Sequence, residues 1–311
     1  MTLAELKEVN RFTFVPATCP ICEADDARPR HVITKYAQGE LTFVTCNRCG
    51  TVYQNPCPDA ASMQQFYLSQ NFFSASRGSG RLVGYLDYDA EEQTRQRNAA
   101  YRLKELEGFF PPGQKLKILK VACGYGTFVK AALDAGHDAT GLDASKAMVD
   151  GARERYGIEL IHSPFLDHDF GAERFDAVLL YGAITNFHHV ARVGQRINEI
   201  LKPGGLYLSN FVEPDTLLER IQGAKFWLYR PPVIGLWSAR AFIEQHRTFG
   251  MDVAACRSDV QWASLGKLAG HIQIDWLTRA LRTLHLHDRH VRVPPFGSVK
   301  VVLRRASGEG R

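Results

Sequence analysis

Long hydrophobic runs are missing from this sequence. The longest ones, such as residues 177–184, are about half of the 18 or so residues that a bilayer-spanning helix requires. The first residues also lack a basic segment followed by an apolar one, so we expect no secretory signal. The chain is therefore expected to be cytoplasmic, without a membrane partner.

Extremes of composition and charge are absent as well. The 311 residues are 45% hydrophobic and 23% charged, which excludes wholesale disorder and fibrous repeats. The formal net charge is only +5, so an anionic partner such as nucleic acid is compatible with the sequence but not required by it. No internal repeat is visible. A chain of this length predicts two units, or one large domain with a small one.

Cysteine is uncommon but unevenly distributed. Four of the seven cysteines form two C-x2-C pairs, and 23 residues separate the pairs. In a cytosolic chain this spacing indicates a metal site, because each pair offers two thiolates to one ion. A closed four-cysteine site predicts structural zinc, held by Cys19, Cys22, Cys46 and Cys49. Gly50 suits the tight turn after the second pair. The alternatives are four unrelated buried thiols or a redox pair.

The composition along the chain predicts three parts. Residues 1–60 contain the cysteine pairs and too few large apolar residues for a core of their own, so we expect a small metal-stapled module there. Residues 61–114 are predicted to be a linker followed by a long helix over 87–110. Residues 115–311 are predicted to form the main domain. We expect metal removal to unfold the module and to leave the main domain folded.

From residue 115 onward, apolar runs alternate with helical segments, which predicts an α/β fold with a doubly wound parallel sheet. The predicted strands are 116–122, 138–142, 158–162, 175–181, 205–211, 252–258 and 298–303. The predicted helices are 127–135, 145–156, 190–201, 216–226, 238–248 and a basic segment near 270–286. In such folds the ligand lies at the carboxyl ends of the strands.

A glycine loop follows the first strand of this domain. Residues 118–128 read as an apolar strand, a loop with Gly124 and Gly126, and the start of a helix. Glycines let the backbone approach a ligand, and a helix N-terminus offers free N–H groups. Seventeen residues after Gly126, Asp143 ends the second strand, where a carboxylate can accept hydrogen bonds from ribose hydroxyls. Together they indicate an adenosine-type ligand; a plain tight turn is the alternative.

With these motifs, and with the segments 174–178 (RFDAV) and 200–205 (ILKPGG), the chain over roughly 115–305 resembles the class I S-adenosylmethionine-dependent methyltransferases. In that family the fourth strand is followed by a helix that ends in L-K-P-G-G. The resemblance implies a Rossmann-like, mostly parallel sheet of seven strands. The zinc knuckles with residues 52–56 resemble the amino-terminal module of bacterial methyltransferases from sugar, surface-polysaccharide or natural-product pathways.

The resemblance also implies S-adenosylmethionine as cofactor and a role for individual residues. Gly124 and Gly126 would lie against its methionine and ribose part, and Asp143 would hold the ribose hydroxyls. Phe165 and Asp167 would flank the adenine. The implied cofactor-binding residues are Ala122, Gly124, Gly126, Asp143, Ala144, Phe165, Asp167 and Tyr181.

Two positions of the glycine-loop motif depart from the family pattern, as do Pro164 in the third loop and Thr185 and Asn186 after the fourth strand. Lys120 replaces the acidic residue of the glycine-loop motif, and a lysine there favours a negative partner such as the cofactor carboxylate. Ala122 replaces the first glycine, which we expect to require a negative φ. These departures leave three alternatives open: weaker binding of the cofactor, a rearranged site, or a domain that binds without catalysis.

Methyl transfer requires positioning and a deprotonated nucleophile. His188 and His189 follow the fourth strand and are candidate general bases, because histidine titrates near neutral pH. With Tyr181, which would lie near the methyl group, they form the predicted catalytic set. The alternative is that one histidine hydrogen-bonds the following helix and the other is solvated.

The expected substrate is a small molecule, such as a nucleotide sugar or a natural-product intermediate. The basic segment 279–292 fits a phosphate-bearing substrate, or else it is a solvated helix face. RNA methylation is a second hypothesis, which is less favoured because the module is not strongly basic and no aromatic-basic stacking array is visible. The sequence indicates no oligomeric state.

Overall fold

The computed structural model describes residues 12–36, 39–68, 91–272, 275–293 and 297–307. Residues 69–90, which hold most of the predicted linker, lie outside this set. None of the helices in the described ranges is long and apolar enough to cross a membrane.

The main domain is built on a seven-stranded sheet with the order β12-β15-β10-β9-β6-β7-β8. Strands β6 to β10 run parallel to their neighbours in this set, and β15 runs antiparallel to both β10 and β12. The predicted doubly wound, mostly parallel sheet of seven strands is confirmed. Its strands are β6 (Lys117–Val121), β7 (Asp138–Asp143), β8 (Ile161–His162), β9 (Phe175–Tyr181), β10 (Leu201–Val212), β12 (Met251–Ser258) and β15 (Ser298–Arg305).

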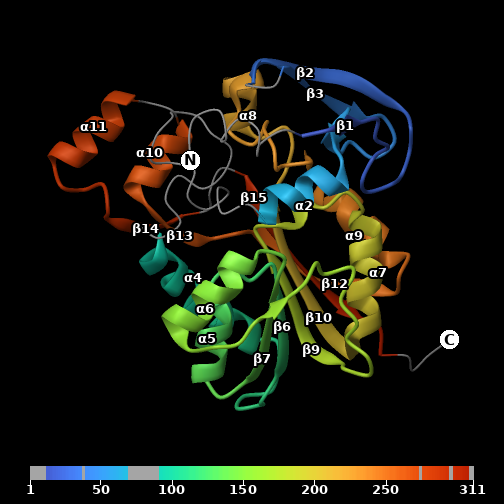
Figure 1. The fold of residues 1–311 in the computed structure, drawn as a ribbon, viewed down its shortest axis with the longest axis vertical. Coiled ribbons are helices and arrows are strands. Elements are labelled where there is room, and N and C mark those ends of the chain that lie inside the picture. Colours follow the sequence, from blue (N-terminus) through green and yellow to red (C-terminus); the bar gives the residue numbers. More distant parts are fainter. Residues whose placement is uncertain (1–11, 37–38, 69–90, 273–274, 294–296, 308–311) are drawn as a thin grey trace.

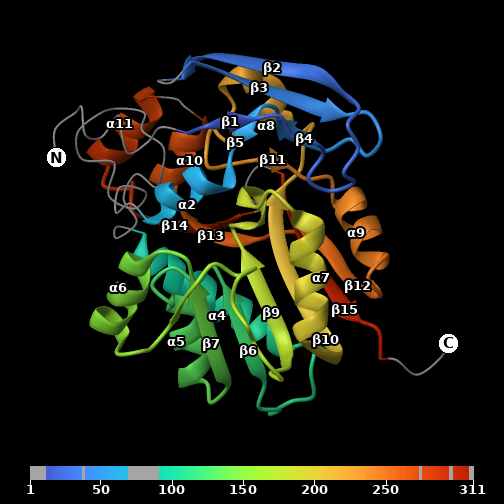
Figure 2. The ribbon, with the colours of Figure 1, turned by 45° about the vertical axis from the view of Figure 1, so that its right-hand side comes forward.

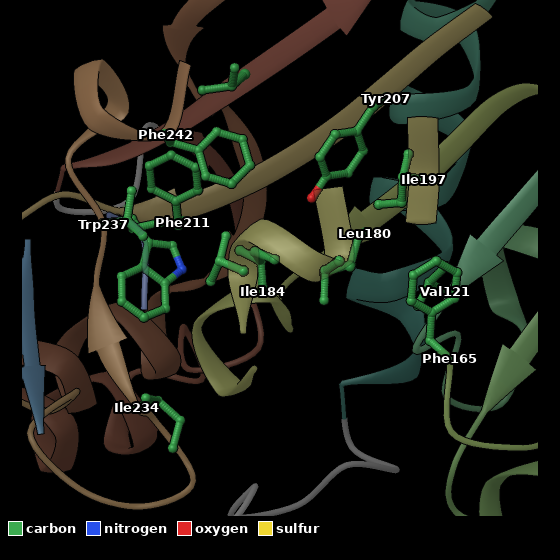
Figure 3. Packing of buried hydrophobic residues seen from close by; sticks show 14 of the residues in the cluster. Val121, Phe165, Leu180, Ile184, Ile197, Tyr207, Phe211, Ile234, Trp237 and Phe242 are labelled. Atoms are coloured by element: carbon green, nitrogen blue, oxygen red, sulfur yellow. The ribbon is translucent and has the colours of Figure 1, made fainter. Parts of the chain in front are cut away.

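Helices cover both faces of this sheet (Figure 1). On one face lie α4 (Glu92–Glu107), α5 (Thr127–Asp134) and α6 (Lys146–Tyr156). On the other face lie α7 (Val190–Ile200) and α9 (Ala239–Arg247), which pack on apolar side chains of the sheet (Figure 3). Because helices cover both faces, β9 is buried at every position, and its sequence is nearly continuous in apolar residues.

A smaller sheet lies over the carboxyl ends of the main strands (Figure 2). Its strand order is β11-β4-β3-β2, and its strands are β2 (Ala27–Tyr36), β3 (Gly39–Cys46), β4 (Val52–Gln54) and β11 (Gly235–Leu236). Beside it, β1 (Phe14–Val15) pairs with β5 (Cys57–Pro58), and α2 (Ala60–Leu68) follows. The edge strand β11 comes from a segment more than 170 residues away from β4 in the chain.

The remaining elements lie in the connections between strands, and the last four of them are inserted between β12 and β15. They are α8 (Leu217–Gln222), the short 3-10 helices Ile184–Asn186 and Gly223–Lys225, the hairpin β13 (Gln261–Ser264) with β14 (His290–Val293), and the helices α10 (Leu265–Ile272) and α11 (Asp275–Thr283). The basic segment near 270–286 was thus predicted as one helix but belongs to two.

Other differences from the predicted elements have local causes. Residues 201–205 do not end a helix, because α7 stops at Ile200 and these residues begin β10. The ladder with β9 is interrupted between Leu201 and Leu206, where Pro203 has no N–H to donate and Gly204 takes a φ of 75°. The edge strand β8 has only two residues instead of the predicted 158–162.

Candidate functional site

The four paired cysteines converge on one point. Their Sγ atoms all lie within 4.8 Å of one another, and the shortest separations are 3.5 Å for Cys19–Cys49 and 3.6 Å for Cys22–Cys46. A zinc ion bound tetrahedrally at about 2.3 Å from each sulfur requires sulfur–sulfur distances of about 3.8 Å. The donor set and its spacing therefore fit a zinc ion.

Tight turns present these thiols. The backbone N–H of Glu23 donates to the Cys19 carbonyl at 2.9 Å, and that of Gly50 donates to the Cys46 carbonyl at 3.0 Å. Gly50 has a φ of 76°, as expected for the turn after the second pair, and a Cβ there would meet no atom within 4 Å. Glycine is thus needed at position 50 for the backbone conformation and not because space for a side chain is lacking.

The glycine loop joins β6 to α5. Ala122, Gly124 and Gly126 all have positive φ, at 49°, 57° and 76°. The expectation that Ala122 requires a negative φ is therefore wrong: this alanine takes the left-handed conformation, at a cost of about 1 kcal/mol relative to ordinary backbone. Gly126, the N-cap of α5, also lacks space for a side chain, since a Cβ would lie 2.8 Å from Ile158 Cδ1.

Asp143 ties the end of β7 to this loop. One carboxylate oxygen accepts a hydrogen bond from the Gly124 N–H at 2.8 Å, and the other accepts one from the Ser145 N–H at 2.9 Å. Burial raises the pKa of Asp143, and these two N–H groups oppose that shift by stabilising the ionised form. The structure thus brings together the loop and the acidic residue that the sequence analysis paired.

The other predicted adenine-side residues are more dispersed. Ala144 is half-buried, and its carbonyl is 3.1 Å from His162 Nε2. Phe165 is buried and packs on Phe170 with ring centroids 5.9 Å apart (Figure 3 shows it near Val121). Asp167 is exposed. The role of Phe165 and Asp167 beside adenine stays a prediction.

Tyr181 ends β9 and is fully enclosed. The guanidinium of Arg102, from α4, lies 4.3 Å from the centre of its ring. Its hydroxyl has no hydrogen-bond partner among the described residues, and burial raises the pKa of this hydroxyl. The next residue, Gly182, donates its N–H to Asn210 Oδ1 at 2.7 Å, so the carboxyl ends of β9 and β10 are joined.

The two candidate histidines have different surroundings. His188 Nε2 is 2.5 Å from the Pro58 carbonyl, so this nitrogen carries the proton and donates to the cysteine module. Burial lowers the pKa of His188. His189 is exposed at the N-cap of α7, and its side chain makes no capping hydrogen bond. Their role as general base stays a prediction.

Sequence inspection did not single out three polar residues that gather at the same edge. Asn210 Nδ2 donates to Asp259 Oδ2 at 2.6 Å, and an Arg102 nitrogen lies 3.6 Å from the same oxygen. They come from β10, from the turn after β12 and from α4. A polar Asn210 within the apolar run of β10 was the one visible signal, whereas Arg102 and Asp259 look like ordinary surface charges.

Comparison with known proteins agrees with this geometry. Residues 119–209 match a family model described as a methyltransferase domain. The demethylmenaquinone methyltransferase of Renibacterium salmoninarum is 33% identical over 105 residues, which cover 33% of this chain and 44% of that protein. The ubiquinone biosynthesis O-methyltransferase of Cereibacter sphaeroides is 29% identical over 126 residues, which cover 38% and 51%. The chain thus spans about half the length of these curated relatives.

A solved structure extends the likeness at the level of the fold. Magnesium protoporphyrin IX methyltransferase from Synechocystis PCC 6803 with bound SAH superposes with a TM-score of 0.51 and 13% identity, covering 80% of this chain and 100% of that one. Its likeness concerns the fold alone. The sheet domain thus has the Rossmann-like fold of the class I methyltransferases, and residues 119–209 within it, which include the glycine loop and Asp143, match the model of a methyltransferase domain.

Proposed function

We propose that this chain is an S-adenosylmethionine-dependent methyltransferase that acts on a small molecule, such as a nucleotide sugar or a natural-product intermediate. One observation carries the proposal: the hydrogen bond from the Gly124 N–H to Asp143, which joins the carboxyl ends of the neighbouring strands β6 and β7. The names of the two curated relatives, which concern demethylmenaquinone and ubiquinone biosynthesis, support a small-molecule acceptor.

In this proposal the cofactor lies along the carboxyl ends of β6, β7 and β9. Bound S-adenosylmethionine supplies an activated methyl group on its sulfonium. The residues proposed to hold it are Ala122, Gly124, Gly126, Asp143, Ala144, Phe165, Asp167 and Tyr181. Asp143 keeps acceptor capacity for ribose hydroxyls, because each of its oxygens accepts one hydrogen bond from the backbone of the described residues and a carboxylate oxygen can accept more than one.

The proposed catalytic residues are Tyr181, His188 and His189. Tyr181 ends β9 next to Gly182, at the mouth where an acceptor would approach. Because Nε2 of His188 donates to Pro58, only Nδ1 of that ring is left to take a proton from an acceptor. His189, whose side chain is exposed, is the second candidate.

We further propose that residues 1–60 form a zinc-held module, that residues 61–114 link it through α4, and that residues 115–311 form the cofactor domain. The proposed ligands are Cys19, Cys22, Cys46 and Cys49, and the role of the ion is structural, because four thiolates leave no open coordination position. Elemental analysis of the purified chain should find one zinc ion per molecule.

Calorimetry with S-adenosylmethionine and S-adenosylhomocysteine tests the cofactor site. Asp143→Ala should weaken binding by about 1–3 kcal/mol, the range for losing a hydrogen-bonded charged partner. Asp138→Ala is the matched control, because Asp138 begins the same strand at its opposite end and is exposed. Equal affinity of both variants and the wild type would contradict the assignment of Asp143.

Transfer is tested separately from binding. The wild-type chain is incubated with methyl-labelled cofactor and a panel that holds nucleotide sugars, quinols and RNA. Label in a small molecule and none in RNA is the expected result. Label in RNA would contradict a small-molecule acceptor, and tight cofactor binding with no transfer to any member would favour a domain that binds without catalysis.

A further inference from the structure

Lys120 is a buried cation at the end of β6. Its side chain is 7% exposed, and its ammonium donates to two carbonyls of its own strand end, Val121 at 2.7 Å and Ala122 at 3.3 Å. Among the described residues, no carboxylate oxygen lies within 4.0 Å of it. A buried ammonium without an anionic partner is costly, because desolvation is not repaid by an ion pair.

A second cation and an unpartnered hydroxyl flank this position. Lys120 is paired in register with Leu179 on β9, so Tyr181 lies two residues further along on the same face. Arg102 covers the Tyr181 ring, and in the part of the chain that the structure describes neither its Nε nor the Tyr181 hydroxyl has a hydrogen-bond partner. Three donors that can serve an anion are thus collected at the ends of β6 and β9.

The carboxylates nearby are already engaged. Both oxygens of Asp143 accept backbone N–H groups, and Asp259 Oδ2 lies 3.6 Å from an Arg102 nitrogen and accepts a hydrogen bond from Asn210. Burial, together with the charge of Arg102, lowers the pKa of Lys120 to about 8, and Cys123 and Asp143 oppose that shift. Lys120 is therefore still mostly protonated at pH 7, beside a like charge that an anion would screen.

We propose that Lys120 and Arg102 hold the carboxylate of the methionine half of S-adenosylmethionine, with the Tyr181 hydroxyl as a third donor. This inference rests on the proposed function. The methionine half carries an ammonium and a carboxylate, and an acidic residue at position 120 would attract the ammonium. With lysine there, the charge preference is reversed, and the chain recognises the cofactor through its carboxylate.

Calorimetry without any acceptor tests this assignment, with three ligands at pH 7. S-adenosylhomocysteine carries the carboxylate, decarboxylated S-adenosylmethionine keeps the ammonium but lacks the carboxylate, and 5′-methylthioadenosine lacks both. Wild type should bind the first at least tenfold more tightly than the second. Lys120→Met should weaken S-adenosylhomocysteine binding at least tenfold and change methylthioadenosine binding by less than twofold. Arg102→Met should shift affinities in the same direction.

Matched variants separate recognition from folding. Lys117→Met removes a cation from the start of the same strand, where it pairs with Glu173 at 2.8 Å, and should leave all three affinities unchanged. Lys120→Arg should retain the preference for the carboxylate. The proposal is overturned if Lys120→Met, shown to be folded by circular dichroism, binds S-adenosylhomocysteine as the wild type does. An equal loss for S-adenosylhomocysteine and methylthioadenosine would also overturn it. If the wild type binds none of the ligands, the proposed function itself fails.

Discussion

The seven-stranded sheet and the cysteine module are ordered in different ways. Every strand of the sheet belongs to the part of the chain after residue 115, and neighbouring apolar runs supply its core. The module draws its last strand, β11, from beyond residue 230, and its thiols converge on a site that fits a metal. One region is built from strands close together in the chain, whereas the other takes a strand from a distant segment and brings four thiols to a spacing that fits a metal ion.

The borrowed strand makes the two regions continuous. Ile21 and Tyr53 of the module and Phe66 of α2 belong to the same buried cluster as Leu180 and Trp237. The backbone N–H of Gln54 donates to the Ile234 carbonyl at 2.8 Å, and the Ile234 N–H donates to the Thr185 carbonyl at 2.7 Å. Ile234 therefore joins β4 of the module to the segment that follows β9.

Metal removal should have the largest effect and tests this continuity directly. Structural zinc sites contribute about 10–16 kcal/mol of apparent binding free energy at pH 7. Because the buried cluster is shared, we now expect Cys46→Ser or chelation to unfold the module and also to lower the melting temperature of the sheet domain by several degrees. Calorimetric scans with and without chelator measure both. An unchanged sheet transition would restore the earlier expectation that the module unfolds alone.

Truncation of Trp237, a side chain in the buried cluster that the two regions share, should have the next largest effect. Trp237 is 0% exposed in the shared cluster, so Trp237→Ala should cost about 3–5 kcal/mol of unfolding free energy through the cavity it leaves. Denaturant unfolding followed at both regions measures it. Trp276→Ala is the control, because that side chain is 66% exposed and its loss should stay within about 0.5 kcal/mol. Similar losses of unfolding free energy for the two variants would contradict the inference that the two regions share one buried cluster.

The sheet domain carries a buried cation, Lys120, whose desolvation lowers the stability of the folded chain. The pKa of Lys120 is lowered from 10.5 to about 8, so between these values the folded chain binds fewer protons than the unfolded chain. The contribution of Lys120 to stability therefore rises with pH across that window, by up to about 3 kcal/mol.

Lys120→Met should accordingly be more stable than the wild type at pH 7, and its advantage should shrink as the pH approaches 10. Denaturant unfolding of both proteins at several pH values measures the difference in their unfolding free energies. The titration of other groups cancels in this difference because both proteins contain them. A difference that does not change with pH would mean that Lys120 is not a charged, desolvated group in the folded chain.

The smallest expected effect concerns Ala122. Its φ of 49° is unfavourable for alanine, so Ala122→Gly should stabilise the chain by about 0.5–1 kcal/mol after the greater backbone entropy of glycine is deducted. Thermal unfolding measures it. Gly124→Ala, where φ is 57°, should shift stability in the opposite direction. Destabilisation by Ala122→Gly would show that the methyl group contributes packing that outweighs the strain.

Much of the sheet domain could be predicted from the sequence because its signals are local. These signals depend only on nearby residues and on the spacing of apolar positions. They are the buried runs at 175–181 and 298–303, the loop with Gly124, and the distance from that loop to Asp143. The four cysteines were also predicted as one set, because two knuckles of fixed spacing have few other uses. Element ends were less predictable, as at 201–205, where a motif expected at a helix end begins a strand.

The sequence by itself determined the order of the elements, the sheet type and the residues that can bind a metal or approach a nucleotide, because periodicity and spacing are properties of the chain. Only the tertiary structure decided that β11 completes the module, that His188 donates to Pro58, and that Arg102 lies over Tyr181 beside Lys120. These contacts join segments tens to hundreds of residues apart. Long-range packing selects them, and no local pattern encodes which distant surface a side chain will meet.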